Sequence, residues 1–167
     1  MPATRQVRVL EEILRAAREA AAAREPSEPV VVSLHAVRAV SAVLDLVEEL
    51  DLVTHHVVPV VHWFTGTSDE LTRLVHAGGY VSVDPAMITG KRGRAYVRQV
   101  PSERLLLESD LPAGPVTPEC DARVLGAAHA DELATALGGL RDALVGLRGR
   151  ESADTLRQNQ ARLYGID

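Results

Sequence analysis

The chain of 167 residues contains little cysteine, few aromatic residues and a single lysine, Lys91. Its one cysteine, Cys120, cannot form an internal disulfide or a Cys-x-x-Cys metal site, which favours a reducing compartment and predicts a cytoplasmic protein. Aromatic residues make up 3% of the chain, which disfavours modules that bind single strands by stacking bases on many aromatic rings. No run approaches the ~18 apolar residues of a membrane span, so we expect no membrane segment.

Acidic residues outnumber lysine and arginine by 23 to 18, which gives a net charge of −5 at pH 7. This charge provides no general attraction to nucleic acid, although a local basic patch can still bind it. Hydrophobic residues make up 46% of the chain and charged residues 25%, as in ordinary globular proteins. The length suits one domain, so we expect residues 1–167 to form a single domain.

Apolar residues alternate between helical spacing and short continuous runs. Helical spacing predicts helices over 7–25, 40–50, 67–75 and 91–100, and apolar runs predict strands over 30–34, 57–61, 80–83 and 105–107. The run over 30–34 is so uniformly apolar that we expect this strand to be buried on both faces. Thr67 and Glu70 fit a capping box for the third helix. Beyond Asp110, three prolines predict a loop, followed by helices over about 131–147 and 152–164.

Four strands that alternate with helices predict an α/β fold with a parallel sheet and right-handed crossovers. Both an open sheet and part of a (β/α) barrel satisfy this pattern. A complete barrel of eight units needs about 250 residues, whereas this chain supplies four units. If the sheet belongs to a barrel, the chain therefore forms half of it.

Three of the four predicted strands run into a residue that can bind a metal ion, namely His35, His62 and, through Glu108 and Ser109, Asp110. The carboxyl ends of parallel strands carry the active site in such folds, so these side chains are expected on one face. Two imidazoles and a carboxylate are an ordinary ligand set for Zn²⁺ or Mn²⁺. Hydrogen-bonded core histidines are the alternative, and the strand ends alone leave both interpretations open.

Three motifs resemble those of TatD-type metal-dependent deoxyribonucleases. Residues 62–67, HWFTGT, resemble the His-x-Phe-Ser/Thr-Gly signature of that family, and residues 106–112, LLESDLP, resemble its Leu-Leu-Glu-Thr-Asp-x-Pro signature. Residues 33–35 followed by Ala39 are similar to its earlier histidine motif. The match is strong over 6–112 and weak over 113–167, where Asn159 resembles the closing Asn-x-x-x-Leu/Phe. Three motifs in the correct order leave little room for an unrelated open α/β domain with coincidental matches.

The resemblance implies a TIM-barrel hydrolase in which Mg²⁺, Mn²⁺ or Zn²⁺ promotes the attack of water on a DNA phosphodiester bond, in single strands or at 3′ ends. By this resemblance, His35, His62 and Asp110 are metal ligands, and Asp110 is also catalytic because it orients the attacking water. Glu108 is either a partner of the ligands or a structural residue, and we favour the structural role. Residues 79–94 resemble one branch in particular, the TatD-like nuclease of Qat-type anti-phage defence.

Four residues are expected to contact the substrate: Trp63, Lys91, Arg92 and Arg94. Trp63 follows a predicted ligand, and it either stacks on a base or packs inside the protein. The three basic residues form the densest basic patch of the chain and are expected to bind phosphates. A solvated start of a helix is the alternative explanation for this patch.

The sequence departs from the family pattern in its metal ligands. The first strand of the family carries His-x-His and a later strand ends in a metal-bridging Glu, and neither has a counterpart here. The chain therefore resembles the C-terminal half of the barrel with the N-terminal strands missing. We expect a complementary N-terminal half or a homo-oligomer to cover the open edge, because exposed strand edges are normally paired or covered. The alternative is a non-catalytic half-barrel module that binds a partner and keeps a partial metal site.

Overall fold

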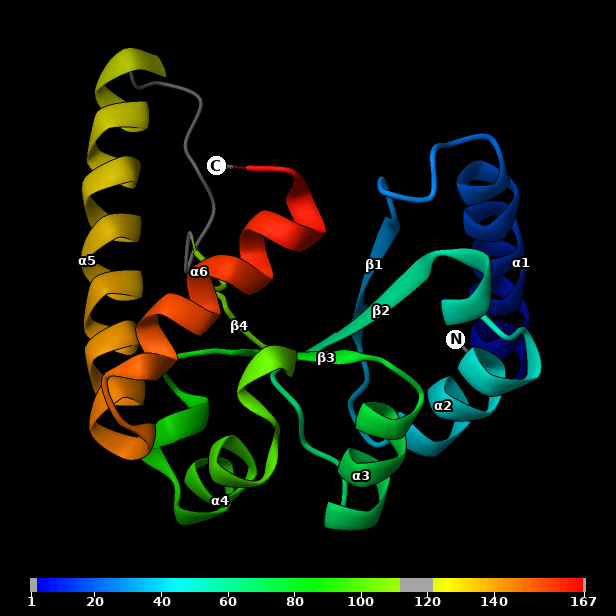
Figure 1. Ribbon diagram of the computed structural model, residues 1–167, viewed down its shortest axis with the longest axis horizontal. Helices are drawn as coiled ribbons and strands as arrows, with labels where there is room; N and C mark the ends of the chain where they lie inside the picture. Colours follow the sequence, from blue (N-terminus) through cyan, green and yellow to red (C-terminus); the bar gives the residue numbers. More distant parts are fainter. Residues whose placement is uncertain (1–2, 112–121, 167) are drawn as a thin grey trace.

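The computed structural model describes residues 3–111 and 122–166. A four-stranded parallel sheet lies at its centre, with the strands in chain order β1-β2-β3-β4 and helices packed around them (Figure 1). This confirms the predicted α/β fold of parallel units. The strands are β1 (Val30–His35), β2 (Val57–His62), β3 (Tyr80–Val83) and β4 (Leu105–Leu107). The α-helices are α1 (Ala3–Ala22), α2 (Val40–Glu49), α3 (Ser68–His76), α4 (Lys91–Gln99), α5 (Ala122–Arg148) and α6 (Glu151–Tyr164).

The start of α3 forms as the sequence predicts. The Thr67 hydroxyl accepts a hydrogen bond from the backbone N–H of Glu70, and the Glu70 carboxylate accepts one from the N–H of Thr67. This capping box satisfies N–H groups that the first turn of a helix leaves without partners. Beyond the other end, Gly78 has a φ of 82°, a conformation that glycine adopts without strain. The chain thus turns directly from α3 into β3.

One face of the sheet packs against helices and forms the main hydrophobic core. Alternate strand residues such as Val61, Val81 and Leu105 point to this face, because successive side chains of a strand lie on opposite sides. All six helices contribute buried side chains to the core: Leu14, Leu44, Leu71, Val97, Leu144 and Leu156. We refer to this side of the sheet as the helix face.

The opposite side, which we call the open face, has a smaller apolar cluster. Val60, Tyr80 and Leu106 are buried there by Leu163 of α6, while Val31 and Val58 are only partly buried. The Asn159 side chain is fully buried one turn before Leu163, and it donates hydrogen bonds to the carbonyls of Ser102 (2.7 Å) and Leu105 (2.9 Å). These bonds attach α6 to the start of β4, so the family-like closing motif has a structural role.

Two expectations about single elements are wrong. β1 is not buried on both faces, because it lies at the edge of the sheet and Leu34 is its only fully buried residue. α5 begins at Ala122 rather than near residue 131. Its first turns are rich in alanine, which favours helix even though Gly126 interrupts the apolar pattern. Cys120 and the proline-rich stretch from Pro112 to Pro118 lie outside the described residues.

Within residues 3–111 and 122–166, no helix has the length and apolar character needed to cross a lipid bilayer.

Candidate active site

The register of the sheet places the two predicted histidine ligands beside each other. His35 pairs with His62 across β1 and β2, and His62 pairs with Ser82 across β2 and β3. Paired residues of parallel strands point to the same face, so all three lie at the carboxyl edge of the open face. Glu108 follows Leu106 by two positions and therefore lies on the same face. The fold brings these polar side chains together from all four strands.

Two contacts connect the imidazoles of His35 and His62 and the carboxylate of Glu108 in a row. His35 Nδ1 lies 3.0 Å from His62 Nε2, with the ring centroids 4.6 Å apart. His62 Nδ1, the other nitrogen of that ring, lies 3.4 Å from Glu108 Oε2. His62 and Glu108 are mostly buried, with side chains 19% and 18% exposed, whereas His35 is exposed at the sheet edge. His62 is therefore held from both sides of its ring.

Glu108 is fixed by two further hydrogen bonds. It accepts one from the backbone N–H of Trp63 (2.9 Å) and one from the Ser82 hydroxyl (2.9 Å). Burial raises the pKa of Glu108 above its usual value, although the bond from Ser82 and the charge of His62 act in the opposite direction. Glu108 thus contacts a predicted ligand, His62, and also joins β2 to β3, so its contacts fit both of the roles that the sequence leaves open. Ser82 was not identified from the sequence, although it is the one polar residue of the strand over 80–83.

The backbone beside the site is strained. Trp63 has a φ of 43° directly after β2, and Asp110 has a φ of 49° shortly after β4. For a bulky side chain such as tryptophan this left-handed conformation is unusual, and residues of this kind cost about 1–3 kcal/mol each and cluster at functional sites. The Trp63 N–H donates to the carbonyl of Ser82 and to Glu108, which holds the turn in place. The strain therefore lies next to the predicted ligands.

The separation of the two histidine nitrogens is compatible with a shared metal ion, although in this structure they are hydrogen-bonded to each other. Two nitrogens that bind one Zn²⁺ tetrahedrally lie about 3.3 Å apart, close to the separation of His35 Nδ1 and His62 Nε2. A carboxylate on the second nitrogen of a histidine, as Glu108 is on His62, orients metal-binding imidazoles in many proteins. Asp110 is exposed at the same edge, but the described residues contain no group of three His, Cys, Asp or Glu side chains placed to hold an ion. The structure thus brings the two histidines together without bringing Asp110 into one group with them.

The loop after β2 is anchored to α4 by Arg92. Its guanidinium donates from Nε to the Tyr96 hydroxyl (2.5 Å) and from Nη2 to the carbonyl of Gly66, and it lies 5.4 Å from the centroid of the Tyr96 ring. Phe64 is buried and packs edge-on against Tyr96, so it is a packing residue. Gly66 has no room for a side chain, since a Cβ atom would lie 2.6 Å from the Phe64 ring. Arg92 therefore shapes the loop that follows His62.

The other predicted substrate contacts differ in their environments. Trp63 is 37% exposed and Lys91 is exposed at the first position of α4. Arg94 is partly buried, and its Nη1 donates to the carbonyls of Ile88 (2.8 Å) and Thr89 (2.6 Å). Trp63 and Lys91 are accessible to a ligand, whereas Arg94 is engaged with the backbone in front of α4.

Two adjoining hollows lie along the carboxyl edge of the sheet. The narrower one, of about 200 Å³, is lined by Trp63 together with the segment before α4. The wider one, of about 450 Å³, is lined by Arg38 and Glu70 among others. Thr65 and Arg92 line both hollows, which are therefore neighbours, and we call the pair the edge groove.

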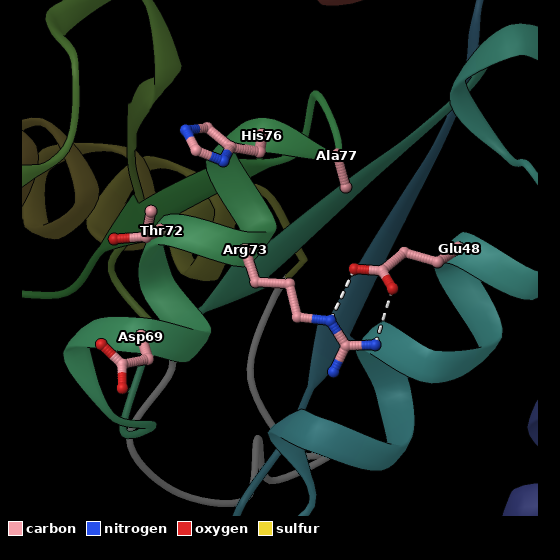
Figure 2. Close-up of a pocket in the computed structure, with 6 residues that line it drawn as sticks. All are labelled: Glu48, Asp69, Thr72, Arg73, His76 and Ala77. Atoms are coloured by element: carbon pink, nitrogen blue, oxygen red, sulfur yellow. Dashed lines mark hydrogen bonds and ion pairs between the residues drawn. The ribbon is translucent and has the colours of Figure 1, made fainter.

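A further hollow, of about 500 Å³, lies between α2 and α3, away from the histidines. Arg73 of α3 reaches across to Glu48 of α2 there (Figure 2), with a distance of 2.6 Å from Nε to Oε1. This bond lowers the pKa of Glu48. None of the predicted site residues lines this hollow, and its ion pair serves to hold the two helices together.

Comparison with known sequences identifies relatives. The sequence model of the family described as "TatD related DNase" matches residues 1–165. The "Deoxyribonuclease Tat-D" of Schizosaccharomyces pombe is 41% identical over 70 residues, which cover 42% of this chain and 20% of that protein. The "3'-5' ssDNA/RNA exonuclease TatD" of Edwardsiella piscicida is 43% identical over 56 residues, which cover 32% of this chain and 22% of that protein.

Comparison with solved structures gives the same fold. YJJV, a TatD homologue from Escherichia coli K12, superposes with a TM-score of 0.59 and 21% identity, over 82% of this chain and 51% of that structure. A TatD family hydrolase from Entamoeba histolytica superposes with a TM-score of 0.52 and 17% identity, over 81% of this chain and 51% of that structure. The chain thus spans about half of these structures, and its aligned segments span about a fifth of the curated relatives.

Proposed function

Because the chain belongs to the TatD related DNase family, we propose that it contributes to the metal-dependent hydrolysis of DNA phosphodiester bonds. The observation that supports this most strongly is the linked series of His35, His62 and Glu108 at the carboxyl edge of the open face. Two imidazole nitrogens there are close enough to share one ion, and a carboxylate orients one of the rings. Active sites of parallel α/β folds lie at this edge.

His35 and His62 would hold the ion, Mg²⁺, Mn²⁺ or Zn²⁺, with Asp110 as a third ligand from the same edge. When bound, the ion supplies positive charge that stabilises the transition state of phosphoryl transfer. Glu108 lies 3.4 Å from His62 Nδ1 and would favour a proton on that nitrogen, which leaves the lone pair of Nε2 on the side of His35. Asp110 is proposed to orient the attacking water and to accept its proton at the carboxylate.

The proposed substrate is single-stranded nucleic acid, cut at or near a 3′ end. Support comes from the relatives of Edwardsiella piscicida and Musicola paradisiaca, both named as 3'-5' ssDNA/RNA exonucleases. Trp63 is exposed beside His62 and offers a surface on which a base can stack. Lys91 and Arg92 would bind phosphates. Arg94 would act through its bonds to the backbone, by holding the segment that carries them.

Completion of the site from outside the chain is part of the proposal. The chain spans about half of the related solved structures, and two histidines with one carboxylate make at most a single metal site. We therefore propose that an N-terminal half or a second copy of the chain covers the open face and adds ligands. A cytoplasmic location and a role in anti-phage defence are further proposals, which rest on the single cysteine and on the resemblance of residues 79–94.

A non-catalytic binding module is the second candidate. The observation in its favour is that Asp110 does not form one group with the two histidines within residues 3–111 and 122–166. Such a module would keep the scaffold and bind an ion or a nucleic acid without cleaving it.

The test is cleavage of a 3′-labelled single-stranded DNA with Mg²⁺, Mn²⁺ or Zn²⁺, with the oligomeric mass measured in the same sample. We expect cleavage by the wild type, loss of cleavage in Asp110→Asn, and wild-type activity in Asp131→Asn, a control at an exposed position of α5. Cleavage by a dimer alone would support completion by a second copy. A folded chain that binds metal and cleaves none of the substrates would show that the chain alone is inactive, as expected for the binding module or for a half that awaits its N-terminal partner.

A further inference from the structure

The wider part of the edge groove contains an arginine that the sequence motifs do not include. Arg38 follows β1, is exposed, and has a φ of 55°, an uncommon conformation for a residue other than glycine. Within residues 3–111 and 122–166, its side chain has no hydrogen bond or ion pair to another residue. It lines the groove together with Val37 and Val40. Its guanidinium is therefore accessible from solvent and available to an external ligand.

Arg92 provides a second guanidinium in the same groove. Two of its donors are occupied by Tyr96 and Gly66, which fixes the orientation of the planar group. A guanidinium has five N–H donors, so the remaining ones can bind a ligand without further ordering of the side chain. Preorganised guanidinium groups are well suited to phosphate oxygens, which they bind in a bidentate manner.

The lining residues of the groove include one acidic side chain, Glu70, whose oxygens are already hydrogen-bonded. Both oxygens of Glu70 are engaged, one by the Ser41 hydroxyl (2.5 Å) and the other by the N–H of Thr67 (2.7 Å). These bonds lower the pKa of Glu70, so that it stays charged, and they place its charge at the positive N-terminus of α3. Two guanidiniums against this one carboxylate leave the lining of the wider hollow with a net positive charge.

We propose that Arg38 and Arg92 bind successive phosphate groups of a single nucleic acid strand, while a base stacks on Trp63 in the narrower part of the groove. This rests on the proposed function and assigns the path of its substrate. Because Thr65 and Arg92 line both hollows, a strand that passes these two residues would reach both parts of the groove. The chain as a whole carries a charge of −5, so a local pair of guanidiniums is needed to attract a phosphate backbone.

The experiment measures binding of a fluorescent ten-residue oligothymidylate by anisotropy, in EDTA so that no cleavage occurs, at several salt concentrations. We expect Arg38→Ala to weaken binding about tenfold and to reduce the slope of log K against log salt by about 0.7, the value for one phosphate contact on a single strand. Arg38→Lys keeps the charge and should recover most of the affinity. Arg98→Ala, near the end of α4 away from the groove, makes the same change in net charge and is the matched control.

The outcomes separate this inference from the nuclease proposal. Binding that depends on Arg38, in a protein that cleaves no DNA with any metal, would support the groove and refute nuclease activity of this chain on its own. Cleavage by the wild type with no greater effect of Arg38→Ala than of Arg98→Ala, on affinity or on the salt slope, would refute the groove and leave the nuclease intact. A wild type that fails to bind the oligothymidylate would also refute the groove.

Discussion

The helix face and the open face of the sheet are built from the same four strands but differ in what covers them. On the helix face, side chains from all six helices enclose the strand residues, and most of the core is fully buried. On the open face, Leu163 of α6 covers Tyr80 and Leu106 near β4, whereas Val31 of β1 stays partly exposed. The polar site lies at the carboxyl edge of this less covered face. Stability and chemistry are thus assigned to opposite sides of one sheet, and mutations on the two sides should have separable effects.

The largest expected effect is on chemistry alone. His62→Ala should reduce metal-dependent cleavage by about 1,000-fold, equivalent to about 4 kcal/mol of transition-state stabilisation, because it removes a nitrogen that would hold the ion. The melting temperature should change little, since the ring fills no part of the helix-face core. Activity is measured on labelled single-stranded DNA and stability by thermal denaturation. Unchanged activity with a lowered melting temperature would reverse the assignment of the two faces.

The next effect concerns the core of the helix face. Leu44→Ala removes a fully buried side chain of α2 and should lower the free energy of unfolding by about 4 kcal/mol, because it leaves a cavity among enclosed neighbours. Leu163→Ala on the open face should cost about 2 kcal/mol, since this side chain has fewer apolar partners. Urea denaturation followed by circular dichroism measures both. Equal losses would mean that the open face is as well packed as the other.

A smaller effect tests the link between Glu108 and the site. Glu108→Gln keeps the shape of the side chain but removes the charge that accepts the His62 proton, and it should lower activity and metal affinity by about 10- to 100-fold. The free energy of unfolding should stay the same or rise. In the wild type, burial of the Glu108 carboxylate is unfavourable, and this burial raises its pKa. Titration with Zn²⁺ gives the metal affinity independently of cleavage. If Glu108→Gln unfolds the protein while Zn²⁺ affinity per folded molecule is unchanged, Glu108 is a structural residue.

The smallest effect compares two valines of β2. Val61→Thr on the helix face should cost about 2 kcal/mol, because the hydroxyl is buried without a partner. Val58→Thr on the open face should cost less than about 0.5 kcal/mol, since Val58 is only partly buried. The two variants are compared by urea denaturation at low and high protein concentration. A cost at Val58 that grows with concentration would show that a second copy covers the open face.

Much of the fold could be predicted from the sequence, because it is encoded locally. The apolar runs of all four strands, the capping box at Thr67 and the turn at Gly78 each depend on a few neighbouring residues. The exposure of β1 could not be predicted, since it depends on which strand lies at the sheet edge. The early start of α5 was missed because its first turns have no clear apolar period.

The candidate site was predicted in part. The positions of His35 and His62 followed from strand ends, and the register confirms that they are neighbours. The contacts of Glu108 with Ser82 and Trp63 join three separate segments, so no spacing along the chain reveals them. Arg38 was missed for a similar reason, because its groove forms only when the loops after β1 and β2 come together.

The strand order of the sheet also has a consequence for folding. Each strand pairs with the one that precedes it in the chain, so every new β-strand can dock on an edge that already exists. Such a sheet can grow strand by strand as the chain leaves the ribosome. The bond from Asn159 of α6 to Leu105 of β4 spans 54 residues. The docking of α6 is therefore expected to follow the formation of the sheet that bears the histidines.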